Sequence, residues 1–141
     1  MIKGKNSYFI IFLIFLLFSG VIFANNKKKK SVILKEKVES KVDFFGRRTF
    51  EGKIVNNLDE RVDFVYIEFN IMNGRNEVIE KVRSYIYGSV YKFRDGSIST
   101  SSLKSGETGT FKCITSVMAD SIKKYDYNIG WKFFEELPEK Y

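Results

Sequence analysis

The segment "VYIEFNIMNGRNEV", residues 65–78, decides the fold class of this chain. Its apolar residues recur at every second position: Val65, Ile67, Phe69 and Ile71. A period of two places these side chains on one face of a β-strand. The dipeptide Asn73-Gly74 follows, and it is the strongest short hairpin signal because both residues accept a positive φ. Since the alternation resumes at Val78 and continues to Ile86, we predict a hairpin with a loop of four or five residues.

Three further segments alternate in the same way. The residues that share one face are Phe50, Gly52 and Ile54; Phe111, Cys113, Thr115 and Val117; and Tyr125, Tyr127, Ile129, Trp131 and Phe133. Each segment is predicted to be a strand that packs this face on the core. Gly52 in the middle of the first strand indicates a bulge or a close backbone approach.

The segment that precedes these strands fits two patterns. In residues 32–45 the residues with strand spacing are Val38, Ser40, Val42 and Phe44. The residues with the spacing of a helix face are Leu34, Val38, Val42 and Phe45. We prefer the strand, and the helix remains open.

The remaining segments of the chain complete an all-β pattern. Residues 87–102, "YGSVYKFRDGSISTSS", predict a long loop or a short irregular edge strand, and "MADSIKK" at 118–124 predicts a short helical turn. The count is about six or seven strands with no convincing helix, which is typical of an antiparallel β-sandwich or barrel. The length of 141 residues corresponds to one domain.

The first residues of the chain have the pattern of a secretory signal. Lys3 and Lys5 precede "YFIIFLIFLLF" at 8–18, and Ala24 is a small residue suited to cleavage. We predict a signal peptide over residues 1–24, which would contact the membrane only transiently. The alternative is an uncleaved anchor, because the apolar stretch of 17 residues at 8–24 is at the short edge of a membrane span. The predicted location is extracytoplasmic: periplasmic, secreted or at the cell surface, and membrane-anchored if cleavage fails.

A basic linker follows the predicted signal. Residues 25–31, "NNKKKKS", contain four consecutive cations: Lys27, Lys28, Lys29 and Lys30. This run accounts for most of the excess positive charge of the mature chain, so the basicity belongs to a tail and not to the folded domain. We predict a polar linker over 25–31, a β-sandwich domain over 32–137 and a tail over 138–141. The run either contacts anionic lipid or polymer or is a solvated tail.

The residues needed for common catalytic and metal sites are missing. The sequence has no histidine, which removes Ser-His-Asp and Cys-His arrangements and most zinc sites. No phosphate-binding or nucleophile motif occurs. The lone Cys113 cannot form an internal disulfide, and its inward position predicts a buried, inert thiol. We therefore expect no enzyme, no cofactor and no metal.

An aromatic and basic cluster is the most promising surface in the sequence. Its residues are Tyr87, Tyr91, Lys92, Phe93 and Arg94. Tyrosine and arginine are enriched at the centres of protein interfaces. We predict an interaction surface here, with the alternative that some of these aromatic side chains complete the core.

Three segments in order resemble a known family. They are "FEGKIVNN" at 50–57, "FNIMNG" at 69–74 and "LKSGETGTF" at 103–111. Together they resemble the FxLYD-type family of small exported Ig-like domains, over about residues 48–131. In the middle segment Phe69, Ile71, Met72 and Asn73 stand where the family has F, L, Y and D, and Ser105 replaces a proline of the third motif. The resemblance implies an Ig-like antiparallel β-sandwich outside the cytoplasm and no reaction.

Two functions from different classes remain. The first is a non-catalytic module that binds another envelope or secreted protein. The second is a binder of anionic surfaces, whether lipid, wall polymer or nucleic acid, through the basic linker and the aromatic and basic cluster. We prefer the first and do not expect nucleic acid as a partner.

Overall fold

The computed structural model of the protein describes residues 30–134. The predicted signal, residues 25–29 of the linker and residues 135–141 lie outside this range. The described residues form nine strands and one short 3-10 turn, η1 (Ala119–Ser121). The strands are β1 (Val32–Leu34), β2 (Glu39–Val42), β3 (Arg47–Asn56), β4 (Asp63–Met72), β5 (Val78–Tyr85), β6 (Ser89–Lys92), β7 (Ile98–Ser102), β8 (Thr108–Met118) and β9 (Lys124–Lys132).

The first sheet is built around β3. The strands β1 and β2 pair with successive parts of one edge of β3, and β8 pairs with the other edge. All of these pairs are antiparallel. Residues 32–45 thus form two short strands, so the strand pattern is confirmed over the helix.

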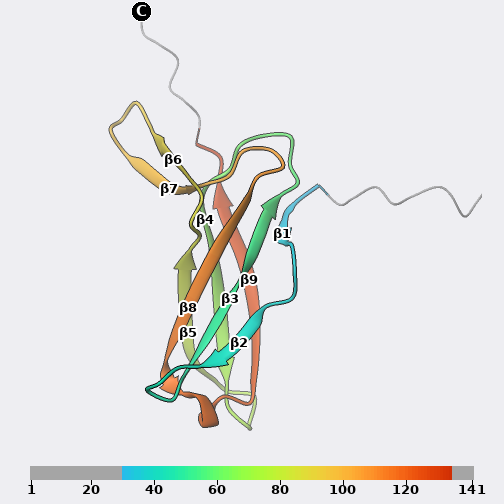
Figure 1. Ribbon diagram of the computed structural model, residues 1–141, viewed down its shortest axis with the longest axis vertical. Coiled ribbons are helices and arrows are strands. Elements are labelled where there is room, and N and C mark those ends of the chain that lie inside the picture. Colours follow the sequence, from blue (N-terminus) through green and yellow to red (C-terminus); the bar gives the residue numbers. More distant parts are fainter. Residues whose placement is uncertain (1–29, 135–141) are drawn as a thin grey trace, which may run out of the picture.

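The second sheet has β4 at its centre, between β5 and β9 (Figure 1). Both pairs are antiparallel, and Phe69 lies opposite Val82 on one side and Tyr127 on the other. The two sheets pack face to face. The ring of Phe50 from β3 stacks on that of Phe69 from β4, with 4.6 Å between the ring centroids. The predicted all-β class and its antiparallel sheets are confirmed.

The core lies between these sheets and follows the predicted alternation. On β4 the buried residues occur at every second position from Asp63 to Ile71. The apolar side chains that are fully buried include Phe50, Ile54, Val65, Ile67, Phe69, Ile71 and Leu103. Burial of each such side chain contributes about 1.5–3 kcal/mol, so this cluster supplies most of the driving force for folding.

The β4–β5 hairpin has the predicted loop length and a different backbone. The loop covers residues 73–77, but the residue with positive φ is Asn76, at 60°, and not Asn73 or Gly74. The side-chain oxygen of Asn73 accepts hydrogen bonds from the backbone N–H groups of Arg75 and Glu77. This side-chain turn replaces the expected two-residue turn and moves the left-handed position to the fourth loop residue.

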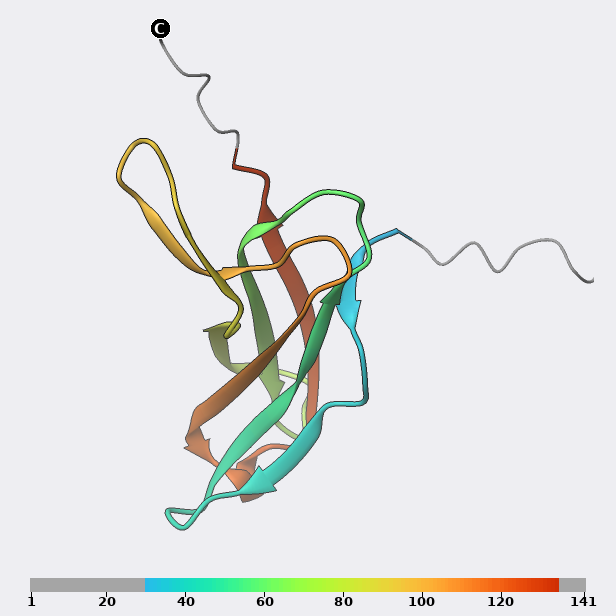
Figure 2. The ribbon, with the colours of Figure 1, turned by 45° about the horizontal axis from the view of Figure 1, so that its top comes forward.

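Residues 87–102 are more regular than predicted. The strands β6 and β7 pair with each other as a hairpin that projects from the end of the sandwich (Figure 2). This hairpin and the division of 32–45 into two strands explain why nine strands occur in residues 30–134 where about six or seven were predicted.

The last strand departs from prediction in one respect. Its apolar face was expected to pack fully on the core, but the side chains of Tyr127 and Phe133 are 44% and 56% exposed. The reason is that β9 lies at the margin of the second sheet, where β4 is its only partner among residues 30–134. The predicted helical turn before it is confirmed as η1.

Candidate functional site

The predicted aromatic and basic cluster does not form one surface. Phe93 is buried, with 3% of its surface exposed, and Tyr91 is half-buried. Tyr87 is exposed beside β8, where it pairs with Thr110. Lys92 and Arg94 are exposed on the β6–β7 hairpin. The placement of Phe93 on an interaction surface is therefore wrong.

Phe93 and Tyr91 attach the β6–β7 hairpin to the body of the domain. The ring of Phe93 lies 4.0 Å from that of Phe134 and 5.7 Å from that of Phe64, between centroids. The guanidinium of Arg61 lies 3.4 Å over the ring of Tyr91. Such a cation–π contact and the aromatic packing stabilise the turn end of the hairpin, because Phe93 opens the turn and its backbone N–H donates to the Ser97 oxygen at 2.8 Å.

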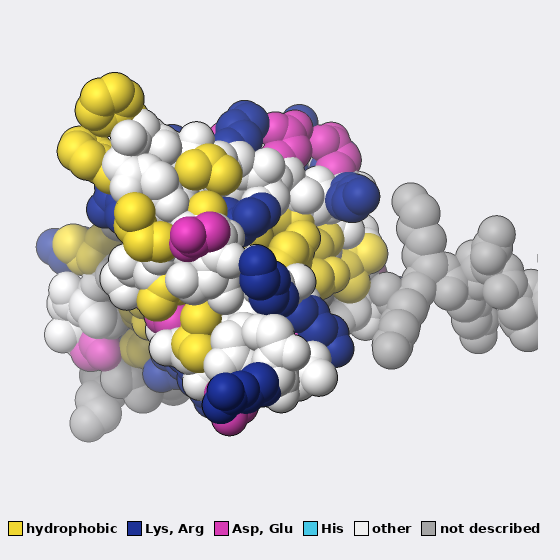
Figure 3. All heavy atoms as spheres, turned by 90° about the horizontal axis from the view of Figure 1, so that it is seen from below, with side chains coloured by type: hydrophobic (Ala, Val, Ile, Leu, Met, Phe, Trp, Pro, Cys, Tyr) yellow, Lys and Arg dark blue, Asp and Glu magenta, His cyan; other side chains and the backbone are white. Residues whose placement is uncertain are grey.

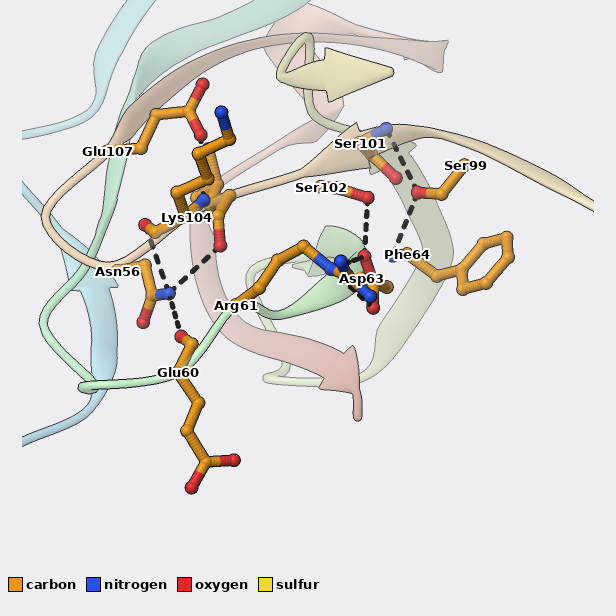
Figure 4. A network of polar contacts seen from close by, with 11 residues as sticks. Asn56, Glu60, Arg61, Asp63, Phe64, Ser99, Ser101, Ser102, Lys104 and Glu107 are labelled. Carbon is orange, nitrogen blue, oxygen red and sulfur yellow. Dashed lines mark hydrogen bonds and ion pairs between the residues drawn. The ribbon is translucent and has the colours of Figure 1, made fainter. Parts of the chain in front are cut away.

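A buried polar network supports the same region (Figure 4). The carboxylate of Asp63 is inaccessible to solvent and accepts hydrogen bonds from Arg61 Nε at 3.1 Å and from Ser102 Oγ at 2.6 Å. The hydroxyl oxygen of Ser99 accepts from the backbone N–H of Phe64 at 3.2 Å. Because the carboxylate is paired and buried, its role is structural.

Asn56 joins two loops at this end of the domain. Its buried side-chain nitrogen donates to the backbone oxygens of Glu60, Leu103 and Lys104 (Figure 4). The turn after Leu103 contains Gly106 at a φ of 76°. The loops at this end are therefore held by their own hydrogen bonds.

Tyr87 lines an open groove over the outer face of β3 and β8. The groove has a volume of about 380 Å³ and is lined by acidic and basic side chains in equal measure. They form ion pairs, such as Lys53 with Glu36 at 3.3 Å and Lys112 with Glu51 at 2.9 Å. The groove thus offers no continuous positive surface to a polyanion.

The end of the molecule opposite the β6–β7 hairpin carries two exposed aromatic side chains (Figure 1). In the turn between β2 and β3, the side chains of Phe44 and Phe45 are 97% and 68% exposed. Their rings contact each other edge to face, with centroids 5.6 Å apart. We call these two side chains the Phe44/Phe45 tip. Figure 3 shows the molecule from this end, where hydrophobic side chains protrude between charged ones.

The turn that carries the tip is held by a dense set of contacts. The carboxylate of Asp43 accepts hydrogen bonds from the backbone N–H groups of Phe45 at 2.9 Å and Arg47 at 2.8 Å. It also accepts one from Arg47 Nε at 2.9 Å. Gly46 supplies the left-handed conformation at a φ of 78°, and the Arg47 guanidinium lies 5.2 Å from the Phe45 ring. The two rings are therefore presented on a preorganised turn.

The strand pattern of residues 32–45 included Phe44 and the alternative helix pattern included Phe45, but both residues lie in the turn that follows β2 (Glu39–Val42). Val42 is also 58% exposed. The signal that was missed is the order Asp-Phe-Phe-Gly: Asp and Gly are turn residues, and two adjacent residues within a turn point in different directions. From the turn between β2 and β3, the rings of Phe44 and Phe45 do not both reach the core.

Cys113 lies in the core as predicted. Its side chain is 2% exposed, and burial, with a smaller effect from the charge of Glu80, raises the pKa of the thiol to about 11. Since the thiolate is the reactive form, this cysteine is poorly suited to chemistry at neutral pH.

The predicted anionic contact falls largely outside the described residues. Lys27, Lys28 and Lys29 precede them, and Lys30 forms an ion pair with Asp59. Within residues 30–134, no group of three His, Cys, Asp or Glu side chains is placed to hold a metal ion. The same residues include no helix with the length and apolarity needed to cross a bilayer.

Comparisons of the chain with protein-family models, with curated proteins and with solved structures found no match.

Proposed function

We propose that the protein is an exported, non-catalytic Ig-like domain that binds another protein of the cell envelope through the Phe44/Phe45 tip. The observation that carries the proposal is the exposure of Phe44, 97%, on a turn fixed by Asp43 and Gly46. Export is inferred from the pattern of residues 1–24, and the Ig-like assignment from the resemblance together with the stacked antiparallel sheets.

The energetics favour an apolar pocket as the binding partner of this tip. Burial of a phenylalanine side chain is worth about 1.5–3 kcal/mol. Because the turn is already ordered, little conformational entropy is lost when the two rings are covered. Aromatic residues are enriched in the buried centres of protein interfaces, where charged residues are depleted.

The charges near the tip favour a protein over a polyanion. Arg47 is paired with Asp43 at 2.8 Å, so the turn itself is close to neutral. An apolar interface of this kind should be nearly insensitive to salt, whereas binding to a polyanion weakens steeply as salt rises.

The test is site-specific photo-crosslinking of the full chain in the cells that make it. A photoreactive phenylalanine analogue at position 44 should crosslink to one envelope protein, identified by mass spectrometry. The same analogue at Val90, which is 69% exposed on the β6–β7 hairpin, is the matched control and should not.

Two further measurements distinguish binding to a protein from binding to an anionic surface. The variant F44S/F45S should weaken binding to the identified protein about tenfold or more, with little change between low and moderate salt. Crosslinks at position 44 that go only to lipid, or equal crosslinking from positions 44 and 90, would overturn the proposal. Binding that disappears with salt and with deletion of residues 27–30 would favour the anionic-surface function.

A further inference from the structure

The strand β9 is an edge strand of the second sheet. It is nine residues long, and within residues 30–134 only β4 pairs with it (Figure 1). The other edge of β9 presents backbone N–H and C=O groups suited to pairing with a further strand. Natural edge strands are commonly protected by proline, by a bulge or by an inward-facing charge.

None of these devices occurs on β9. The strand has no proline, and its inward-facing residues are uncharged: Tyr125, Tyr127, Ile129 and Trp131. The irregularity in the β4–β9 pair lies on β4, because the step from Asp63 to Tyr66 faces the shorter step from Lys132 to Gly130. The strand is therefore regular, its second edge is unpaired within residues 30–134, and 44% of Tyr127 remains exposed at its margin.

We propose that β9 pairs with β9 of a second copy of this chain, antiparallel and centred on Ile129. In this register Asp126 lies opposite Lys132 of the other copy, and by two-fold symmetry this ion pair forms twice. The same register places Tyr127 opposite Trp131 and Tyr125 opposite Phe133. Opposite charges and aromatic pairs across adjacent strands both stabilise a sheet.

Other registers are less complementary. A shift of one residue between the strands would set the apolar face of one against the polar face of the other. Centring the pair on Asn128 would oppose Lys124 and Lys132, which repel each other. Centring it on Tyr127 would leave Asp126 opposite Asn128, with no ion pair. The Ile129 register is thus selected by charge.

The side chains of this register are accessible in the single chain. Asp126 and Lys132 are both exposed. One carboxylate oxygen of Asp126 accepts a hydrogen bond from Asn70 at 2.6 Å, and the second oxygen remains for a lysine. The paired strands would form one continuous sheet of the order β5-β4-β9-β9-β4-β5. The Phe44/Phe45 tips would then lie at opposite ends, because β9 runs away from the end that carries the tip (Figure 1).

The first test is a charge exchange followed by sedimentation velocity on the protein purified from the cells that make it. The unchanged protein should sediment as a dimer at micromolar concentration. D126K and K132D should each raise the dimer dissociation constant about tenfold or more, since each turns both ion pairs into repulsions. The double variant D126K/K132D restores opposite charges and should restore the dimer.

The second test uses introduced disulfides. The native Cys113 stays in place, because its buried thiol should not react under mild oxidation. D126C/K132C should form a disulfide-linked dimer under mild oxidation, whereas D126C and K132C alone should not. A monomer from the unchanged protein, a dimer that both charge variants leave intact, or equal crosslinking by the single cysteines would overturn the proposal. F44S/F45S should leave the dimer unchanged, so this inference and the proposed function fail independently.

Discussion

The ring of Phe111 on β8 lies against the inner face of Gly52 on β3, its register partner. A Cβ atom at Gly52 would lie 2.9 Å from two carbons of this ring, closer than real Cβ contacts. The glycine was predicted to mark a bulge or a close backbone approach. The irregularity of β3 lies elsewhere, between Arg47 and Thr49, and the group that approaches the glycine is the aromatic ring.

Replacement of this glycine tests the contact. Gly52→Ala should lower the free energy of unfolding by about 1–3 kcal/mol, because the ring must move within a packed core. Urea denaturation measures the change. Phe111→Leu should remove the clash, so the double variant G52A/F111L should lose less stability than the sum of the two single losses. Additive losses would show that Gly52 and Phe111 do not interact in this way.

The β4–β5 loop provides a test that separates two turn types. Gly74 does not adopt a positive φ, and the nearest atom to an added Cβ is Lys123 Cγ at 3.8 Å. Gly74→Ala should therefore leave stability unchanged or raise it by up to about 1 kcal/mol, through a less flexible unfolded chain.

The neighbouring asparagine should respond in the opposite way. Asn76→Gly should be nearly neutral, whereas Asn76→Val should cost about 1–2 kcal/mol, because Asn76 has a φ of 60°. Thermal unfolding of the variants provides the comparison. A destabilising Gly74→Ala with a harmless Asn76→Val would instead support the two-residue turn expected from Asn73-Gly74.

Loss of the buried carboxylate of Asp63 should lower the free energy of unfolding more than loss of its hydroxyl partner Ser102. Asp63→Ala removes the acceptor for Arg61 and Ser102 and should cost about 3 kcal/mol or more. Ser102→Ala removes one hydrogen bond and should cost about 1 kcal/mol. Urea denaturation of both variants measures the difference. Equal losses would mean that the ion pair with Arg61 adds nothing to stability.

The buried thiol of Cys113 should make the free energy of unfolding depend on pH above about pH 9. The pKa of its thiol rises from 9.0 to about 11 on folding, so the folded state holds the proton more tightly than the unfolded state. The resulting stabilisation is complete below about pH 9 and is lost between about pH 9 and 11, to a total of about 2–3 kcal/mol.

A matched variant isolates this contribution from other groups that titrate at high pH. The difference in unfolding free energy between the unchanged protein and Cys113→Ala should shrink as pH rises from 8 to about 11. In addition, iodoacetamide should modify the native thiol far more slowly than the thiol of the urea-unfolded chain. Equal rates of modification would contradict a buried, protonated thiol.

The strands of the core were the most predictable part of the molecule. On β4 the buried apolar residues Val65, Ile67, Phe69 and Ile71 recur at every second position, and on β8 Phe111 and Cys113 keep the same spacing, which favours a strand over a helix. The β6–β7 hairpin was not predicted because the buried residues of its two strands are Ser99, Ser101 and Ser102. Serine gives no apolar signal, and these side chains are buried because partners such as Asp63 and Phe64 form hydrogen bonds with them.

The candidate site was less predictable than the core. The sequence places Tyr91 and Phe93 beside basic residues and contains no sign that Arg61, Phe64 and Phe134 cover them. Conversely, Phe44 and Phe45 have the composition of core residues, and only their place in a tight turn exposes them. Whether an aromatic side chain is core or surface depends on neighbours that are distant in sequence.

The sequence by itself determined the all-β class, the long strands of the core, the inward position of Cys113 and the loops that contain turn residues. These features depend on side-chain periodicity and on local backbone preferences, which act over a few residues. The tertiary structure alone decided which aromatic residues are exposed, which glycine contacts an aromatic ring, and that β9 lies at the margin of its sheet. Those outcomes depend on which strands become neighbours, and strand pairing is set by packing between segments far apart in the chain.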